Sequence, residues 1–469
     1  MAQYDIVIGL EVHAELKTNS KVFCGCKNEF GSEPNTHCCP VCIGLPGALP
    51  VLNKKAVELV IKAGLAMGCE INDLAVFERK NYFYPDLAKA YQISQLVRPI
   101  CIGGHIDITG KTVRLNRIHL EEDAGKLVHS TQAIGTLIDY NRGGVPLMEL
   151  VTEPDISSAE EAVEFLTKLR SNLIYAGVAD CKMEQGGMRC DVNLSIKPKG
   201  SKELGQRTEM KNLNSFKSVY RAIQFEAQRQ IEVIEAGGKI IQETRKWDDM
   251  RGKSSAMRKK ETSQDYRYFP DPDMLAVTIK REDVAKIKET LPMLAEERKK
   301  KYIEEYGLPE YDAEVLTRDK EYSDYFDEAV KLYNEPKLIS NWFMTDIMSK
   351  MKEGYDEIGL SPKQLTDIIS LLEKKEISRT NAKEIFVKVW GTTDDVKKLA
   401  KAYGGTVSET ELKALVEKIV TANPKVVEDY HNDPQPEKVL RWFVGQVMKE
   451  TKGRANGGFT EAYLKELLK

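Results

Sequence analysis

The segment IGLEVHAEL at residues 8–16 combines a strand pattern with a row of charged side chains. It continues the β-branched run DIVIGL at residues 5–10, and such a run predicts a strand. Side chains on a strand alternate between its two faces. One face therefore carries Leu10, Val12, Ala14 and Leu16, and the other carries Glu11, His13 and Glu15. The apolar face suits a hydrophobic core, so the polar face needs a separate explanation.

The whole chain has the composition of a large globular protein. Its 469 residues are 42% hydrophobic and 30% charged, which suits about two to four domains with sizeable cores. No apolar run approaches the ~20 residues of a membrane span, and the N-terminus MAQYDIVIG lacks the pattern of a secretory signal. We therefore expect a cytoplasmic protein with no membrane contact, whose nine cysteines are reduced or bound to metal.

The distribution of strand and helix patterns predicts an α+β fold in three parts. Up to about residue 290, short strand-like runs alternate with glycine-rich turns, and amphipathic helices intervene at residues 157–177 and 215–238. Beyond that point the strand patterns stop and charged helical segments follow. We predict a mixed-sheet catalytic domain at residues 1–290, an all-helical domain at residues 291–400 and a small helical tail domain at residues 401–469.

A cysteine-rich loop at residues 24–42 carries the sharpest local motif. Its spacing is C-x-C-x12-C-x2-C, formed by Cys24, Cys26, Cys39 and Cys42. Two close pairs across a loop can supply four thiolates to a tetrahedral zinc ion. Four thiolates leave no open coordination position, so the zinc would be structural. His37 and Cys38 remain alternative ligands, and a loop of metal-free cysteines is the competing interpretation.

Acidic side chains gather at the end of one strand-like run and again further along the chain. Glu121, Glu122 and Asp123 lie together in HLEEDAGK, and Glu149 lies in PLMEL. Oxygen-rich groups of this kind suit Mg²⁺, which completes its shell with water and phosphate. Together with Glu11 and His13 they predict a metal site for phosphoryl transfer, provided that the fold brings them together. Taken singly, acids at strand ends are usually solvated.

Cations and aromatic rings follow turns in the same half of the chain. The candidates for binding phosphate are Lys80, Arg142, Arg189 and Lys211, because their charges can neutralise phosphate oxygens. The rings of NYFYPD at residues 81–86 and DYRYFPDPD at residues 265–273 can stack on a base, although core packing explains many such rings equally well. GGHIDITGKT has five residues between its glycines where a phosphate loop has four, so such a loop does not hold ATP.

The tail carries a basic segment despite the chain's net charge of −3. Lys449, Lys452 and Arg454 end a predicted helix beside Gly453, Gly457 and Gly458. Glycines allow a close approach of backbone to phosphate, and RNA helices are recognised largely through shape and backbone contacts. These three cations are therefore candidates for binding RNA. The alternative is a solvated helix terminus whose cations complement the helix dipole.

These motifs together resemble one family, the B subunits of aspartyl/glutamyl-tRNA(Asn/Gln) amidotransferases, also called the GatB family. The resemblance is carried by IGLEVHAEL, the cysteine quartet, NYFYPDL, RIHLEEDAGK, DYNRGGVPLMELVTEPD, MRCDVNLSI, RTEMKNLNSF and DYRYFPDPD. It runs through residues 4–280 and resumes in NWFMTDI and VGQVMKETKGRAN. LAKAYQIS departs from the LPKGYQIS of relatives, and the tail has GRANGGF where relatives often have a proline.

The resemblance implies a cradle-like catalytic domain, a helical domain and a tail domain. It implies a ligase that activates the side-chain carboxylate of Glu-tRNA(Gln) or Asp-tRNA(Asn) with ATP and Mg²⁺. It also implies an amidase-family A subunit that supplies ammonia, and a small C subunit that joins the two others in a heterotrimer. The catalytic and Mg²⁺-binding residues that it indicates are Glu11, His13, Glu122 and Glu149, with the choice between Glu121 and Glu122 left open.

Two other functional classes compete with this interpretation. One is a tRNA-binding scaffold subunit with no chemistry of its own, which the clusters of acids and cations disfavour. The other is a ligase with an ATP-grasp or phosphate-loop domain, which the missing phosphate loop disfavours. The sequence does not decide which misacylated tRNA is used.

Overall fold

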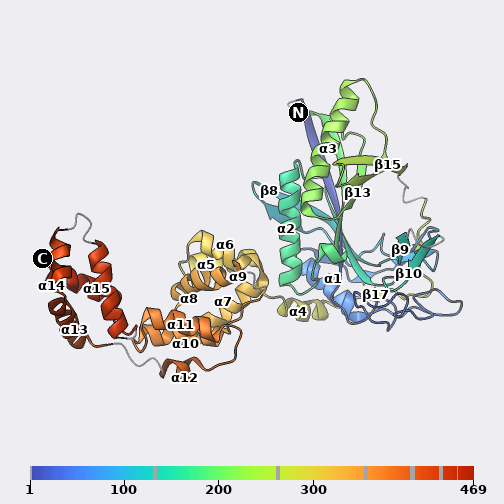
Figure 1. The fold of residues 1–469 in the computed structure, drawn as a ribbon. Coiled ribbons are helices and arrows are strands. Elements are labelled where there is room, and N and C mark those ends of the chain that lie inside the picture. Colours follow the sequence, from blue (N-terminus) through green and yellow to red (C-terminus); the bar gives the residue numbers. More distant parts are fainter. Residues whose placement is uncertain are drawn as a thin grey trace. The chain divides into compact units, whose positions relative to one another are not determined.

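The computed structural model describes residues 3–129, 135–259, 265–352, 357–401, 407–432, 437–451 and 453–468. The chain divides into two compact units, Met1–Ala295 and Glu296–Lys469. The first unit contains the strands and the second is built from helices (Figure 1). This arrangement confirms the predicted α+β class, in which a mixed-sheet domain precedes helical domains.

The first unit is built on a mixed sheet with the strand order β15-β14-β13-β12-β1-β11-β8-β6-β2, and β7 pairs with β8. Its strands are β1 (Tyr4–Glu15), β2 (Glu70–Ile71), β6 (Cys101–Ile102), β7 (His105–Ile108), β8 (Lys111–Glu122), β11 (Pro146–Thr152), β12 (Met188–Pro198), β13 (Thr208–Leu213), β14 (Glu243–Asp248) and β15 (Lys253–Lys259). Strands β13 and β14 are parallel, and the other neighbours are antiparallel. β1 therefore lies in the middle of the sheet.

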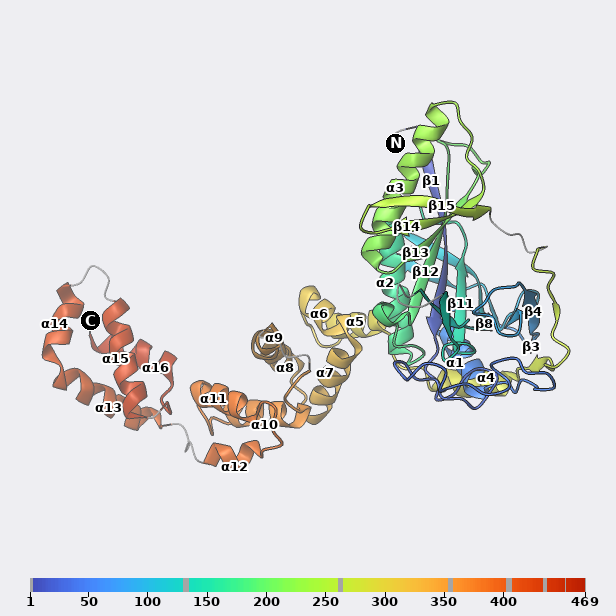
Figure 2. The same ribbon diagram turned by 45° about the vertical axis from the view of Figure 1, so that its right-hand side comes forward.

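Three small sheets flank the main one. They are formed by β3 (Leu74–Ala75) with β17 (Val277–Thr278), by β4 (Glu78–Asn81) with β5 (Tyr91–Ser94) and β16 (Phe269–Pro270), and by β9 (Lys126–His129) with β10 (Thr136–Asp139). The pairing of β16 with β4 joins the segment around residue 270 to the segment around residue 80. Figure 2 shows the small strands β3 and β4 beside the lower part of the main sheet.

Helices cover the apolar face of the main sheet. They are α1 (Lys54–Ala66), α2 (Ala159–Tyr175) and α3 (Phe216–Glu235), and α2 and α3 lie side by side along the sheet (Figure 1). α2 begins where Ser158 accepts a hydrogen bond from the Glu161 N–H, and it ends before Gly177, which has a positive φ of 67°. The predicted apolar row of β1 is buried in this core. The short helices η1 (Met183–Gln185) and α4 (Arg281–Glu289) complete the unit.

The second unit has two separate hydrophobic clusters and no strand among its described residues. The helices around the first cluster are α5 (Ala295–Glu304), α6 (Glu310–Arg318), α7 (Lys320–Leu332), α8 (Pro336–Trp342), the π-helix η2 (Phe343–Ile347), α9 (Met348–Lys352), α10 (Pro362–Glu373), α11 (Arg379–Val389) and α12 (Val396–Lys401). Those around the second are α13 (Glu409–Ala422), α14 (Pro424–Asn432), α15 (Glu437–Glu450) and α16 (Gly457–Leu467). The three-domain boundaries drawn from the sequence remain predictions.

The sequence-based prediction of the fold was incomplete at two elements and cannot be compared with the structure at one boundary. The strand β11 and the helix α1 were not predicted, because β11 is a short run with an acid in its middle and α1 has a lysine-rich first turn. The predicted break at KAYGGTVSET falls partly on residues 402–406, which lie outside the described residues. Among the helices that the structure describes, none combines the length and apolar character needed to cross a membrane.

The apolar interface between α2 and the sheet makes a direct prediction about stability. Leu169 is fully buried there, whereas Leu275 is 89% exposed. We expect Leu169→Ala to lower the free energy of unfolding by about 2–5 kcal/mol, because it removes buried methyl groups and leaves a cavity. The matched control Leu275→Ala should change it by less than about 0.5 kcal/mol. Urea denaturation of the full chain measures both, and equal effects would contradict the assigned core.

Candidate active site

The polar face of β1 continues across the neighbouring strands because of the strand register. His13 lies opposite Glu149 of β11 and opposite Arg189 of β12, and Glu149 in turn lies opposite His119 of β8. Directly opposite residues in an antiparallel pair point to the same face of the sheet. The register therefore forms one row of polar side chains across four strands, on the face away from α1, α2 and α3.

Two imidazoles and three carboxylates converge in the centre of this face. The Nε2 atom of His13 lies 3.3 Å from Oε2 of Glu149 and 3.5 Å from Oε1 of Glu121. The Nε2 atom of His119 lies 3.6 Å from Oε2 of Glu121 and 3.6 Å from Oε2 of Glu149. Glu11 joins His13 and Glu149 as a third potential ligand group. We refer to Glu11, His13, His119, Glu121 and Glu149 as the acid–histidine cluster.

The electrostatics of the acid–histidine cluster favour a bound cation. Burial lowers the pKa of His13, but the hydrogen bond and the charge of Glu149 outweigh burial and raise this pKa to about 9. Burial and the charge of Glu149 raise the pKa of Glu11. Two buried carboxylates, Glu121 and Glu149, and the half-buried Glu11 therefore compete for positive charge. Ionised carboxylates and imidazole nitrogens are ligands that divalent cations accept. The donor set fits a divalent metal such as Mg²⁺.

Glu122 lies on the other face of β8 and does not belong to this cluster. Its carboxylate forms an ion pair with Lys89, with a distance of 2.5 Å between Nζ and Oε1, and it accepts a hydrogen bond from the Ile93 N–H. Successive strand residues point to opposite faces, so only one of Glu121 and Glu122 can face His13. The structure places Glu121 there, and this corrects the sequence-based choice of Glu122.

The four predicted phosphate-binding cations all border the polar face. Lys80 is close enough to Glu121 and Glu149 for their charges to raise its pKa. Lys211 forms ion pairs with Asp191 and Glu209. Lys80 and Lys211 therefore each have acidic neighbours, which hold them at the edge of the acid–histidine cluster.

Arg142 and Arg189 meet at one buried carboxylate. Arg189 forms an ion pair with Asp123, and Nε of Arg142 lies 3.5 Å from the same carboxylate. Arg142 also donates hydrogen bonds to the backbone carbonyls of Ala124 and Gly125. Asp123 therefore fixes both guanidinium groups beside the acid–histidine cluster.

Aromatic side chains from two distant segments meet beside Lys80. The rings of Tyr82 and Tyr266 make an edge-to-face contact with centroids 5.9 Å apart, and Tyr266 and Tyr268 make a similar contact at 6.1 Å. Nζ of Lys80 lies 5.0 Å from the centroid of the Tyr266 ring. Phe83 is 82% exposed, so it packs in no core. Base stacking by these rings remains a prediction.

The four sulfurs of the cysteine-rich loop form one compact group. The Sγ atoms of Cys24, Cys26, Cys39 and Cys42 lie within 4.8 Å of one another, and those of Cys39 and Cys42 are 3.9 Å apart. Tetrahedral zinc with bonds of ~2.3 Å places its sulfurs about 3.8 Å apart, so the group fits zinc. A hydrogen bond from Cys24 lowers the pKa of Cys42 to about 4, which favours a thiolate ligand.

The alternative ligands His37 and Cys38 lie outside this four-sulfur group. The His37 N–H donates to the side chain of Asn141, and its carbonyl accepts a hydrogen bond from Lys21. Lys21 is fully buried and also donates to the Tyr140 carbonyl. The cysteine-rich loop is therefore tied to the segment that carries Arg142.

Comparison with known proteins gives the family. Residues 6–285 match the model of the GatB/GatE catalytic domain, and residues 324–468 match the model of the GatB domain. The chain belongs to the GatB family. It is 52% identical over 479 residues to the B subunit of the aspartyl/glutamyl-tRNA(Asn/Gln) amidotransferase of Caldicellulosiruptor bescii, with 99% of both chains covered. It is 50% identical over 485 residues to the protein of the same name from Lachnospira eligens, with both chains covered completely.

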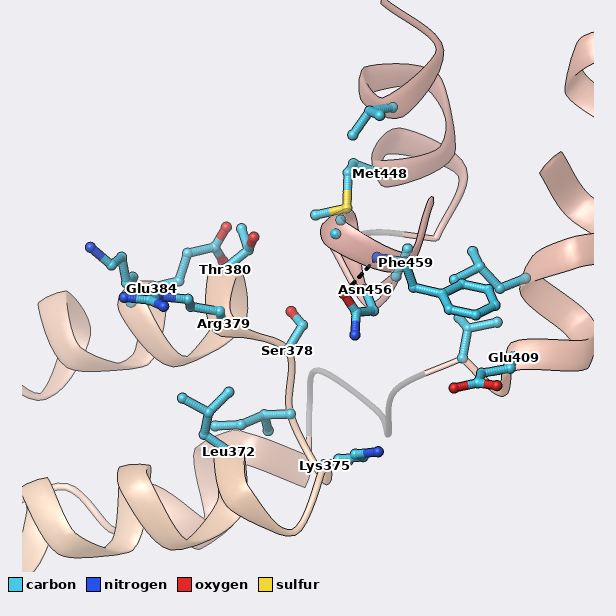
Figure 3. A pocket seen from close by; sticks show the side chains of 18 of the residues that line it. Leu372, Lys375, Ser378, Arg379, Thr380, Glu384, Glu409, Met448, Asn456 and Phe459 are labelled. Atoms are coloured by element: carbon cyan, nitrogen blue, oxygen red, sulfur yellow. Dashed lines mark hydrogen bonds between the residues drawn. The ribbon is translucent and has the colours of Figure 1, made fainter. Parts of the chain in front are cut away.

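The first and the second unit each contain a cavity large enough to hold a ligand. A cavity of about 980 Å³ beside the acid–histidine cluster is lined by Glu15, Arg142 and Arg189, and burial raises the pKa of Glu15 to about 7. A cavity of about 1380 Å³ lies in the second unit, where Figure 3 shows Arg379 and Glu384 on one side and Phe459 on the other. The larger cavity does not mark the candidate active site, because the acid–histidine cluster lies in the first unit, beside the smaller cavity.

The predicted RNA-binding cations are only partly described. Lys449 lies exposed in the last turn of α15, and Nε of Arg454 donates a hydrogen bond to the Thr451 carbonyl. Lys452 lies outside the described residues. Lys449 therefore lies in the last turn of α15 and Arg454 follows soon after this helix. That these two cations bind RNA remains a prediction.

Sequence reasoning missed His119. The signal was available, because Arg117, His119 and Glu121 alternate with Ile118 and Leu120 in the run RIHLEE. This alternation repeats the pattern of β1, with an apolar face and a face that carries a histidine between charged residues.

The cysteine group gives a prediction about metal content. We expect Cys42→Ser to lower both the bound zinc and the melting temperature of the full chain, because the binding energy of a structural zinc stabilises the folded state. The control Cys38→Ser changes a cysteine of the same loop that lies outside the four-sulfur group, and it should retain the zinc. Elemental analysis and thermal denaturation measure these effects, and stable wild-type protein that contains no zinc would contradict the prediction.

Proposed function

We propose that this chain is the B subunit of a tRNA-dependent amidotransferase and carries the site that activates a side-chain carboxylate with ATP. The substrate would be Glu-tRNA(Gln), Asp-tRNA(Asn) or both, and the reaction would be that of a ligase that forms a carbon–nitrogen bond. The acid–histidine cluster supports this proposal, because holding two buried carboxylates, Glu121 and Glu149, beside the half-buried Glu11 is costly unless a site needs them. A tRNA-binding scaffold with no catalytic role would not explain why the chain holds these carboxylates together at a cost in folding free energy.

The chemistry explains why ATP is required. A carboxylate does not accept an amine at neutral pH, because its oxygen is a poor leaving group. In the proposed first step a carboxylate oxygen attacks the γ-phosphorus, and the bond from this phosphorus to ADP breaks. In the second step ammonia attacks the carbonyl carbon of the acyl phosphate, the bond from carbon to the phosphate oxygen breaks, and a proton leaves the nitrogen. Phosphate and the amide are the products.

The proposed roles of the chain's own residues follow from their positions. The acid–histidine cluster would hold Mg²⁺, and the bound ion would neutralise charge that develops on the phosphate oxygens. Lys80 and the pair Arg142 and Arg189 border this cluster and would orient the phosphates. The carboxylates of Glu121 and Asp123 keep these cations in place before the substrate arrives.

The proposed partners supply what this chain does not carry. An amidase-family A subunit would release ammonia from glutamine, and a small C subunit would join the two others in the cytoplasm. The misacylated tRNA would bind partly through the second unit. Basic side chains of that unit, Lys375, Arg379 and Lys383, line its large cavity, and cations of this kind suit a phosphate backbone (Figure 3).

The proposed active site is tested with the complete heterotrimer. We expect Glu11→Gln and His13→Ala each to lower amidation of Glu-tRNA(Gln) by at least about 100-fold, because each removes a ligand that holds the charge on the phosphates. Glutamine hydrolysis without tRNA should stay within about 2-fold of the wild type, since the A subunit would perform it. Amidation and glutamine hydrolysis are measured on the same preparations.

The matched controls are Glu70→Gln and His105→Ala. These residues lie in the same unit, are exposed, and have no place in the acid–histidine cluster. Both controls should amidate like the wild type. Near-normal amidation by Glu11→Gln and by His13→Ala would exclude the proposed site.

The tail gives a prediction about tRNA binding. The proposed cavity contacts mainly the amino acid and the common CCA end, so selection of the tRNA needs contacts elsewhere. We expect charge reversal of Lys449 and Arg454 to raise KM for aminoacyl-tRNA by about 10-fold or more with little change in kcat, and to weaken the salt dependence of binding. Truncation before residue 401 should raise KM further and spare glutamine hydrolysis.

The control for the tail is charge reversal of Lys286, an exposed lysine of α4 in the first unit. It should leave KM for aminoacyl-tRNA unchanged. A truncated heterotrimer that amidates its tRNA with the wild-type KM would show that the tail has another role.

A further inference from the structure

The ammonium group of Lys21 is buried without a carboxylate partner. Lys21 is 0% exposed, and its Nζ atom donates hydrogen bonds to the carbonyls of His37, at 2.8 Å, and of Tyr140, at 3.2 Å. It forms no ion pair with a carboxylate in the described part of the chain. A buried cation costs free energy unless negative charge compensates it, and two carbonyl dipoles compensate it only in part. The burial of Lys21 therefore calls for a nearby source of negative charge.

The cysteine group supplies this charge when it holds zinc, because Zn²⁺ with four thiolates is a dianion. Lys21 and Cys42 both lie beside Gly144: a Cβ atom built on Gly144 would lie 3.4 Å from Cδ of Lys21 and 3.8 Å from Cβ of Cys42. The hydrogen bond from Cys24 is the main cause of the low pKa of Cys42, and the positive charge of Lys21 lowers this pKa further. The ammonium group and the zinc-loaded cysteine group are therefore electrostatically complementary.

The same lysine supports the turn that carries Arg142. The Tyr140 carbonyl accepts one hydrogen bond from Nζ of Lys21 and another from the N–H of Gly143, which closes the turn around Arg142. From this turn the guanidinium group of Arg142 reaches Asp123, with a distance of 3.5 Å between Nε and the carboxylate. One side chain and one backbone turn therefore connect the cysteine group to a cation assigned to the phosphates.

A second contact between the cysteine-rich loop and this turn is uncharged. Nδ2 of Asn35 donates to the Ile138 carbonyl, and Oδ1 of Asn35 accepts a hydrogen bond from the Tyr140 N–H. Asn35 is exposed, so this contact does not depend on a neighbouring charge. The contact through Lys21 differs, because its burial is favourable only when the cysteine group is negatively charged.

We propose that Lys21 is a positioning residue that couples the zinc centre to the phosphate-binding turn. Its ammonium group is the counterion of the zinc–thiolate group, and through the Tyr140 carbonyl it keeps Arg142 in position for the phosphates of ATP. This inference rests on the proposed function, which gives Arg142 its ligand. Loss of zinc would remove the charge that compensates Lys21, so the turn would lose its support. Zinc content would then influence ATP binding although zinc does not touch ATP.

The first measurement tests Lys21 against the metal. The zinc affinity of the full chain is measured by competition with a chromogenic chelator. We expect Lys21→Met to lower this affinity by about 10-fold or more, because it keeps the length of the side chain and removes the charge beside the thiolates. Lys21→Gln also removes the charge and should act alike, so a folding defect of one variant does not decide the result. The control Lys17→Met changes a lysine whose side chain is 63% exposed, and it should keep the wild-type affinity.

Cobalt in place of zinc gives a spectroscopic signature of the same contact. Co²⁺ bound by thiolates absorbs through charge transfer from sulfur to metal, and the energy of this transition depends on charges beside the sulfurs. Lys21→Met should shift the band to longer wavelength, because the thiolates lose a neighbouring cation, whereas Lys17→Met should not shift it. If Lys21 only filled space in the core, the band would stay in place.

The second measurement tests the link to Arg142. The dissociation constant of a non-hydrolysable ATP analogue is measured with Mg²⁺ on the full chain. We expect Lys21→Met to raise this constant by about 10-fold, the effect of one misplaced charge-assisted hydrogen bond. In the Arg142→Ala background the same substitution should change it by less than about 2-fold, because a residue that acts through Arg142 has no effect once Arg142 is removed.

Two results would overturn the proposal. One is a wild-type zinc affinity with an unshifted cobalt band in both Lys21 variants. The other is an effect of Lys21→Met on analogue binding that persists in full in the Arg142→Ala background. Neither would exclude ATP-dependent amidation, because amidation by Glu11→Gln tests that function separately. Conversely, a wild-type chain that binds zinc but not the analogue would reject both the proposed function and the link to Arg142, and the zinc affinities would still decide whether Lys21 serves the zinc centre.

Discussion

The antiparallel register of β1 between β11 and β12 determines which side chains of the first unit face the core and which face the acid–histidine cluster. It places His13 opposite both Glu149 and Arg189, and it turns every second residue of β1 toward the core. A shift of the register by one residue would bury charged side chains under α2 and α3 and expose the apolar row. The packing of the helices and the position of the acid–histidine cluster are therefore set by the same hydrogen-bonded ladder.

The two faces of the sheet have opposite energetic roles. The helix-covered face stabilises the unit by removing apolar side chains from water. The other face holds carboxylates close together, which opposes folding unless cations compensate. Lys80, Arg142 and Arg189 supply part of that compensation from three different segments. The site is consequently poised to bind further positive charge, and this is the property that ATP-dependent phosphoryl transfer requires.

The sequence predicted the local features well and the long-range pairings poorly. Alternation along residues 8–16 gave both faces of β1, Ser158 marked the start of α2, and cysteine spacing gave the four-sulfur group. The partner of each acid could not be predicted, because the register between distant strands decides it. Glu122 illustrates this, since its ion pair with Lys89 joins segments 33 residues apart. The family resemblance supplied the function, which no local pattern specified.

The most direct test of carboxylate activation follows one oxygen atom. Glu-tRNA(Gln) labelled with ¹⁸O in its side-chain carboxylate is amidated by the complete heterotrimer with unlabelled ATP, and the released phosphate is analysed by mass spectrometry. The account predicts that each phosphate released with a molecule of Gln-tRNA(Gln) carries one ¹⁸O atom, because the acyl phosphate passes a carboxylate oxygen to phosphate. Amidation that releases only unlabelled phosphate would contradict the account.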